Sequence, residues 1–256
     1  MVMELVILCF IGVTGMIVGS FLNVCIYRIP RKESLAWPAS HCPACNHTLG
    51  VLDLIPVLSF IFLRRRCRYC GTQISWRYPI VESLTAVLWS LAWLEYGFSL
   101  EFLPAVIFIS LGIVIAFIDL DQKIIPNVIS LPGIIIGLLL ALLIGQPSIL
   151  DALIGAAGGG ALLFLVVLLS RGGMGGGDAK LLAMIGAFFG WQGAVTALML
   201  GSVAGAVIGI LLILFKVIKR RDPVPFGPFL VLGAGIYLFF SEIIVDHFSA
   251  LLCGLP

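Results

Sequence analysis

Long apolar stretches with few charges alternate along the chain with short polar connections. A bilayer core about 30 Å thick is crossed by a helix of roughly 20 apolar residues, and eight stretches approach that length. They lie at residues 4–27, 80–96, 101–118, 128–145, 150–170, 180–192, 194–216 and 226–246. The sixth stretch is short, and only residues 191–193 separate it from the seventh. The pattern predicts an all-α polytopic integral membrane protein with about eight transmembrane helices.

The composition agrees with this pattern. Of the 256 residues, 61% are hydrophobic and 11% are charged, whereas soluble domains carry about 45–50% apolar and about 25% charged residues. The composition therefore excludes an ordinary soluble protein. The length of the first apolar stretch, and Glu4 in place of a basic region before it, favour a membrane span over a cleaved signal peptide.

The fifteen Lys and Arg residues are unevenly distributed over the connections. Eight lie from Arg28 to Arg77, the others lie in the remaining odd-numbered connections, and the even-numbered connections contain none. Because basic residues stay preferentially on the cytoplasmic side, we expect both termini outside. The chain is expected to divide into a first transmembrane helix (1–27), a cytoplasmic insert (28–79) and a seven-helix transmembrane core (80–256).

Four of the seven cysteines lie in the insert, as two Cys-x-x-Cys pairs. They are Cys42 and Cys45, and Cys67 and Cys70. Two such pairs let four thiolates converge on one Zn²⁺, which closes the coordination shell and makes the metal structural. A reducing cytoplasm disfavours disulfides instead. An insert of about fifty residues cannot bury much core, so a metal staple is physically reasonable.

The residues next to these cysteines refine the zinc prediction. Asn46 and Gly71 each follow the second cysteine of a pair, where the chain often needs a positive φ, and both residue types tolerate it. His41 and His47 flank the first pair and are alternative ligands, although solvated loop histidines are the simpler interpretation.

Two aspartates stand out among the acidic residues. Asp119 ends the third apolar stretch, and Asp178 begins the sixth after a glycine-rich segment. The charge pattern puts both on the same side at similar depth, where an ionisable group is a candidate functional site. Two carboxylates brought close share a proton, which provides a general acid and a general base for aspartic proteolysis. Taken singly, Asp119 could be an interfacial residue balanced by Lys123, and Asp178 a helix cap.

These segments together resemble the type IV prepilin peptidases, bifunctional leader peptidases and N-methyltransferases of pilus, type II secretion and competence systems. The matching segments are Gly19-Ser-Phe-Leu-Asn-Val-Cys-Ile-Tyr-Arg-Ile-Pro30, both cysteine pairs, Ile74-Ser-Trp-Arg-Tyr-Pro-Ile-Val-Glu82, Asp119 seven residues before Pro126, Gly175-Gly-Gly-Asp178 with Lys180, and Pro225-Phe-Gly-Pro-Phe229.

The resemblance implies that Asp119 and Asp178 are the catalytic aspartates of a GxGD-type intramembrane protease, and that Asp121 is not. It implies cleavage of a prepilin or pseudopilin leader after a glycine at the cytoplasmic face of the bacterial cytoplasmic membrane. S-adenosylmethionine would then methylate the new N-terminus. No Gly-x-Gly-x-x-Gly turn of the Rossmann type is present, so the residues that bind this cofactor are not assigned.

An ion-coupled transporter with a zinc-stapled regulatory insert is the alternative class, in which the carboxylates would relay protons. Transporters commonly have two related halves with broken helices at the midplane. Here no related halves are apparent, and the two aspartates lie toward one face. Beyond prepilins and the bilayer, no nucleic-acid partner is expected, and the sequence does not determine the oligomeric state.

Overall fold

The structure is a computed structural model of the whole chain. It describes residues 2–170, 175–219, 222 and 224–253, and of residues 247–253 only the backbone. Three of the basic residues that predict sidedness, Arg171, Arg220 and Arg221, lie outside the described residues.

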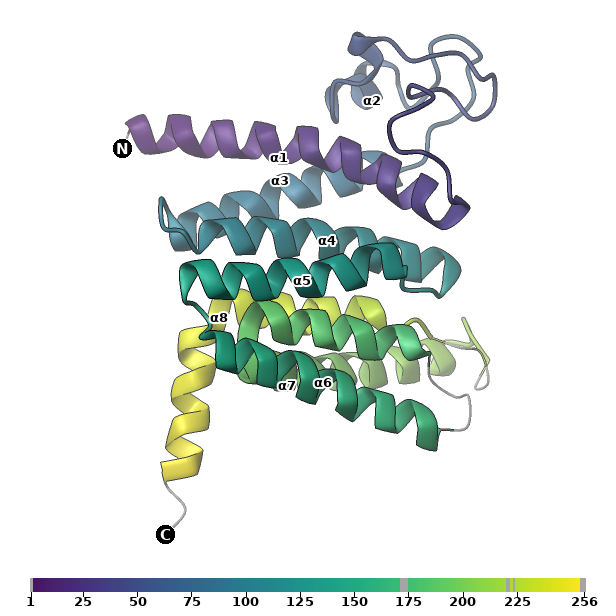
Figure 1. Cartoon of the computed structure of the whole chain (residues 1–256). Helices are drawn as coiled ribbons and strands as arrows, with labels where there is room; N and C mark the ends of the chain where they lie inside the picture. The colour runs from purple at the N-terminus through teal and green to yellow at the C-terminus, as the bar shows by residue number, and fades with distance from the viewer. Residues whose placement is uncertain (1, 171–174, 220–221, 223, 254–256) are drawn as a thin grey trace. The chain divides into compact units, whose positions relative to one another are not determined.

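Helices form the regular structure of the described residues, and the expectation of an all-α protein is confirmed (Figure 1). The long helices are α1 (Val2–Arg28), α3 (Arg77–Tyr96), α4 (Phe102–Gln122), α5 (Asn127–Ile144), α6 (Ile149–Leu169), α7 (Gly176–Leu214) and α8 (Gly227–Cys253). Between α1 and α3 the insert contains the short helices η1 (Ile29–Arg31), η2 (Val51–Asp53) and α2 (Leu58–Phe62).

Within the described residues, six helices are long and apolar enough to cross a membrane, namely α1 and α4 to α8. The helix α3 has 20 residues but carries charges at both ends. The helix α7 has 39 residues, or about 58 Å at 1.5 Å per residue, which is roughly twice the thickness of a bilayer core. Its backbone breaks at Gly190 (φ 70°, ψ −173°), just before the separation expected at residues 191–193. The number of membrane crossings therefore stays a prediction.

The chain forms two compact units, Met1–Phe102 and Leu103–Pro256. In the first unit, glycines let α1 approach α3 closely, as small residues do between membrane helices. A Cβ on Gly15 would lie 2.8 Å from the Cα of Ala86, and one on Gly19 would lie 2.7 Å from the Cα of Glu82. The buried Glu82 carboxylate also accepts the N–H of Val57 at 2.8 Å, which attaches the insert to α3.

In the second unit, α7 lies against α5, α6 and α8 (Figure 1). The α6–α7 contact also depends on glycine, because a Cβ on Gly155 would lie 2.5 Å from the carbonyl carbon of Gly190. Aromatic rings fill the middle of this unit: Phe108 of α4 contacts Phe189 of α7 with ring centroids 4.6 Å apart. This packing fixes where the ends of α4, α7 and α8 meet.

Candidate functional site

Asp119 lies in the last turn of α4, and its side chain is 5% exposed. The helix ends directly afterwards, because Lys123 takes a left-handed conformation (φ 56°) and donates its N–H to the Asp119 carbonyl at 2.8 Å. Pro126 then precedes α5 and disfavours helical backbone at the residue before it. Asp121, two residues after Asp119, is exposed.

Asp178 lies in the first turn of α7, and its side chain is 8% exposed. A helix N-terminus is a favourable place for a carboxylate, because the helix dipole is positive there. The preceding glycine allows a close approach: a Cβ on Gly177 would lie 2.9 Å from the Cβ of Ile125. Lys180 strengthens the same contact by donating from Nζ to Oδ1 of Asn127 at 2.7 Å. The start of α7 is therefore attached to the start of α5.

The structure brings the two predicted aspartates together. The helix ends that carry them meet at Ile125, which lies against Gly177 beside Asp178 and against Gly227 beside Asp119. The two carboxyl groups also interact electrostatically. The N–H of Gly227, the first residue of α8, donates to Oδ2 of Asp119 at 2.9 Å in a buried position. The site thus consists of the end of α4 and the starts of α7 and α8.

Sequence reasoning missed two residues of this site, Gly227 and Ile125. A Cβ on Gly227 would lie 2.8 Å from Oδ2 of Asp119 and 3.3 Å from Cδ1 of Ile125. Gly227 is 108 positions from Asp119, so no local spacing connects the two residues. Its place within the Pro225–Phe229 motif was the only signal available in the sequence.

The four predicted cysteines converge in the insert. Their Sγ atoms all lie within 4.8 Å of one another, and those of Cys42 and Cys70 are 3.8 Å apart. A tetrahedron with a zinc–sulfur distance of about 2.3 Å has sulfur atoms about 3.8 Å apart. The four thiols therefore fit a tetrahedral Zn²⁺ site.

The backbone around the cysteines has the predicted turns. The φ angles of Asn46 and Gly71 are 57° and 71°, which confirms the expected positive φ at both positions. Asn46 donates its N–H to the Cys42 carbonyl at 2.8 Å, and Gly71 donates to the Cys67 carbonyl at 2.9 Å. The two pairs are thus held in matching turns.

The surroundings of Cys70 favour metal binding, whereas the two histidines make other contacts. The hydroxyl and backbone of Thr72 lower the pKa of Cys70 to about 6, which favours the thiolate that a metal needs. His47 stacks on Tyr69 with ring centroids 3.6 Å apart, and Nδ1 of His41 lies 3.1 Å from the Ala39 carbonyl oxygen. Neither histidine belongs to the group of candidate ligands found among the described residues.

A second set of contacts joins the two halves of the insert. Oδ1 of Asp53 accepts from Nε of Arg68 at 2.7 Å, and Oδ2 accepts from the Tyr69 hydroxyl at 3.2 Å. Desolvation raises the pKa of Asp53, but the hydrogen bonds from Arg68, the Gly50 N–H and Tyr69 outweigh it, so the pKa is lowered overall. The segment between the pairs is therefore connected to the second pair.

The fold and the two sites define a class: a multi-pass α-helical membrane protein with paired buried aspartates and a four-cysteine insert. Residues 13–96 match the bacterial peptidase A24 N-terminal domain, and residues 106–210 match the type IV leader peptidase family. The chain belongs to the type IV leader peptidase family. Its apolar helices and its family make it a protein of the bacterial inner membrane.

Individual relatives agree with the family. The chain is 36% identical to a protein of Bacillus subtilis over 96% of this chain and 100% of that protein. It is 38% identical to one of Aeromonas hydrophila over 89% of both chains. It is 43% identical to one of Myxococcus xanthus over 80% of this chain, although it spans only 63% of that protein's length. All three are named prepilin leader peptidase/N-methyltransferase. No solved structure matches the chain.

Proposed function

We propose that this chain is an aspartic endopeptidase that removes the leader of prepilins or pseudopilins and N-methylates the new N-terminus. The observation that carries the peptidase assignment is the meeting of two buried aspartates, from α4 and α7, beside the Gly227 N–H. Family membership supports the same reaction. Nothing in the comparisons favours the ion-coupled transporter.

The geometry supports different roles for the two carboxyl groups. The Gly227 N–H donates to the Asp119 carboxylate and stabilises its ionised form, which makes Asp119 the general base. Asp178 then holds the shared proton and acts as the general acid. Asp119 takes a proton from water while the water oxygen attacks the scissile carbonyl, and Asp178 donates its proton to the carbonyl oxygen. The proton now on Asp119 passes to the leaving amine as the peptide bond breaks, and Asp178 recovers its proton from a hydroxyl of the tetrahedral intermediate, which becomes the free carboxyl group.

The glycines that precede Asp178 leave room for a substrate peptide beside its carboxyl group. Gly175 and Gly176 are exposed, and a Cβ on Gly176 would meet nothing within 4 Å. An extended leader peptide can therefore lie against bare backbone next to Asp178, where side chains would otherwise hold it away.

The peptidase assignment is tested by Asp119→Asn and Asp178→Asn, with the exposed Asp121→Asn as a matched control. General acid–base catalysis contributes about 10²–10⁴-fold, so each of the first two variants should slow leader cleavage by that amount. Asp121→Asn should cleave normally. Cleavage of a purified prepilin is followed by product mass, and all variants should keep the thermal stability and zinc content of the wild type. Normal cleavage by both active-site variants would contradict the assignment.

The methylation assignment rests on the family and on the relatives' names. S-adenosylmethionine is its proposed methyl donor. In the presence of this donor, the mature pilin should gain one methyl group at its N-terminus, measured by mass spectrometry of the same reaction. A product that stays unmethylated while cleavage proceeds would identify a peptidase that has lost methyl transfer.

The four insert cysteines are proposed to hold one structural Zn²⁺. Four thiolates complete a tetrahedral shell and leave no position for a catalytic water. The protein purified under reducing conditions should contain one zinc per chain, and the double variant Cys42→Ser/Cys70→Ser should contain none. Cys9→Ser is the control, since Cys9 lies in α1 outside the group. Wild-type protein without zinc would refute the site.

The termini are proposed to lie outside, with the insert and both aspartates toward the cytoplasm. The distribution of Lys and Arg supports this orientation. Alkaline phosphatase, which is active only outside the cytoplasm, should be active when fused at residues 145–148 and inactive when fused at residues 216–219. The reverse pattern would overturn the orientation.

A further inference from the structure

The insert exposes an apolar surface between its two cysteine pairs. Val51 is 85% exposed and Phe62 is 80% exposed. The other large apolar residues exposed in this segment are Leu52, Leu54, Ile55, Leu58 and Ile61. Large apolar side chains exposed together in one short segment are typical of a site of contact with a partner or a membrane. None of these exposed apolar residues takes part in the proposed leader cleavage.

Three arginines, Arg64, Arg65 and Arg66, follow this apolar segment directly. Arg64 and Arg65 both have a left-handed backbone, with φ of 48° and 62°. Such a conformation costs about 1–3 kcal/mol per residue and persists only where the surroundings enforce it. Here Arg65 donates its N–H to the Phe60 carbonyl at 2.9 Å and its Nε–H to the Ile74 carbonyl at 3.1 Å. The position of the Arg65 guanidinium is therefore determined by the fold.

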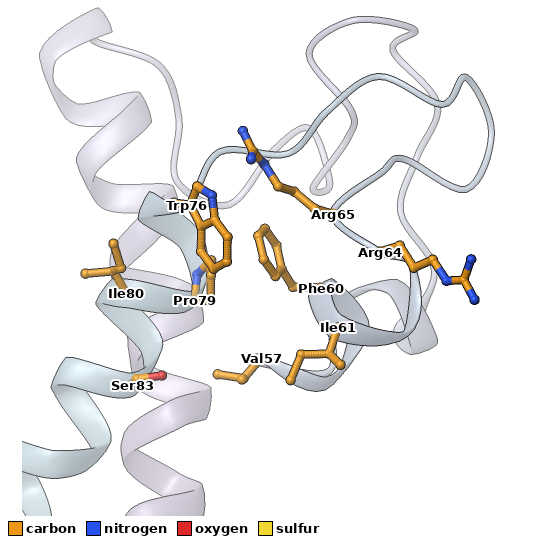
Figure 2. Close-up of a pocket in the computed structure, with 9 residues that line it drawn as sticks. All are labelled: Val57, Phe60, Ile61, Arg64, Arg65, Trp76, Pro79, Ile80 and Ser83. Atoms are coloured by element: carbon orange, nitrogen blue, oxygen red, sulfur yellow. The ribbon is translucent and has the colours of Figure 1, made fainter.

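Arg65 lies at one end of an apolar pocket of about 510 Å³ between α2 and the first two turns of α3 (Figure 2). The guanidinium carbon of Arg65 is 5.5 Å from the centre of the Trp76 ring. The walls below are apolar: Val57 and Ile61 come from the insert, and Ile80 comes from α3. Figure 2 shows the Arg64 guanidinium directed away from this pocket. The pocket thus has a cationic group at one end and apolar walls along the rest of it.

The position of the pocket along α3 indicates what it binds. If α3 is the predicted second span, its first turns lie at the boundary between lipid headgroups and acyl chains. Tryptophan is enriched at that level, and basic residues there attract the anionic lipids of the cytoplasmic leaflet. An amphiphile with a negative head and an apolar tail matches both the charge and the lining.

We propose that the apolar segment of the insert rests on the cytoplasmic leaflet and that the pocket binds one anionic phospholipid. The phosphate of this lipid pairs with Arg65, and one acyl chain packs along Val57, Ile61 and Ile80. The contact holds the four-cysteine module at the membrane surface. It rests on the proposed orientation and on α3 as the second membrane span, and it involves neither aspartate.

The first test compares Arg65→Gln with Arg66→Gln, two variants that lose the same charge from neighbouring positions. Native mass spectrometry of the full chain measures retention of phosphatidylglycerol and phosphatidylcholine. One basic residue near an anionic lipid contributes about 1 kcal/mol, so Arg65→Gln should bind phosphatidylglycerol about fivefold more weakly. Arg66→Gln should bind it as the wild type does. Equal binding by the two variants, at equal zinc content, would overturn the pairing with Arg65.

The second test uses Trp76 as a reporter that needs no change at Arg65. Vesicles contain either brominated phosphatidylglycerol or brominated phosphatidylcholine, and the Trp76 signal is the difference between wild type and Trp76→Phe. Brominated phosphatidylglycerol should quench this signal more strongly. Glycerol phosphate, which has a headgroup but no acyl chain, should not relieve the quenching. Equal quenching by the two lipids, or no quenching by either, would refute a bound anionic lipid. Neither outcome bears on the peptidase assignment, because the experiment does not involve the two aspartates.

Discussion

Gly227→Ala tests whether the start of α8 positions the Asp119 carboxylate. The added methyl carbon would lie 2.8 Å from Oδ2 of Asp119 and 3.3 Å from Cδ1 of Ile125. Non-bonded heavy atoms pack at about 3.5–4.0 Å, so the carboxylate or the start of the helix must move by roughly 0.7 Å. That movement also lengthens the 2.9 Å hydrogen bond from the Gly227 N–H.

Both effects reduce activity without unfolding the helix. A hydrogen bond to a charged group contributes about 1.5–3 kcal/mol, and a displacement of about 1 Å in an active site can cost 10²-fold. We therefore expect kcat/KM for leader cleavage to fall by about 10- to 100-fold.

The matched control is Gly235→Ala in the same helix, where a Cβ would meet nothing within 4 Å. It should cleave at the wild-type rate. Initial rates are measured in detergent micelles with a purified prepilin, alongside thermal unfolding of each variant. Equal cleavage rates for Gly227→Ala and Gly235→Ala would show that the start of α8 does not position the Asp119 carboxylate. A wild-type unfolding temperature in both variants would exclude a general loss of folding.

Three further predictions concern the first unit. Gly19→Ala should lower the thermal stability of the purified protein by about 1–3 kcal/mol through overpacking against α3, whereas Gly12→Ala, 3.4 Å from a serine hydroxyl, should not. Asn46→Val should release zinc to a chromogenic chelator faster than Asn46→Gly, because a left-handed backbone costs a residue with a Cβ about 1–2 kcal/mol. Asp53→Asn should weaken zinc retention in urea by less than about 1 kcal/mol, because the Arg68 side chain of this ion pair is 47% exposed and solvent screens the attraction. Because the lowered pKa keeps Asp53 ionised at neutral pH, this last difference should be constant from about pH 6 to pH 8, and only acid below the ordinary carboxyl pKa near 3.9 should remove it. A difference that disappears within that neutral range would contradict the role of the carboxylate.

Local patterns predicted the features that depend on local chemistry. The spacing of the cysteines predicted a four-thiol cluster, and the residue types at positions 46 and 71 predicted the left-handed turns that the structure contains. Apolar length predicted the helices, since each long helix overlaps at least one expected stretch. In each case the determining residues lie within a few positions of one another or form a continuous run.

Features that depend on distant segments were not predictable in this way. The Gly227 hydrogen bond to Asp119 joins two helices that pack only in the folded unit. The helix α2 and the apolar pocket beside it arise because residues 57–62 meet the start of α3. In α7, tertiary contact with Gly155 accompanies the break at Gly190, while residues 191–193 continue as helix. Such contacts have no periodic signal in the sequence.

The close approach of α1 and α3 at Gly15 and Gly19 also changes the thermodynamics of metal binding. Bringing the two ends of an insert of roughly 50 residues together costs about 3.5 kcal/mol in loop-closure entropy, from (3/2)RT ln n. The packing of α1 against α3 offsets this cost when the helix pair assembles, before any thiolate binds a metal. The insert should consequently bind Zn²⁺ more tightly within the whole chain than as an isolated peptide, and loss of the metal should leave the two helices paired.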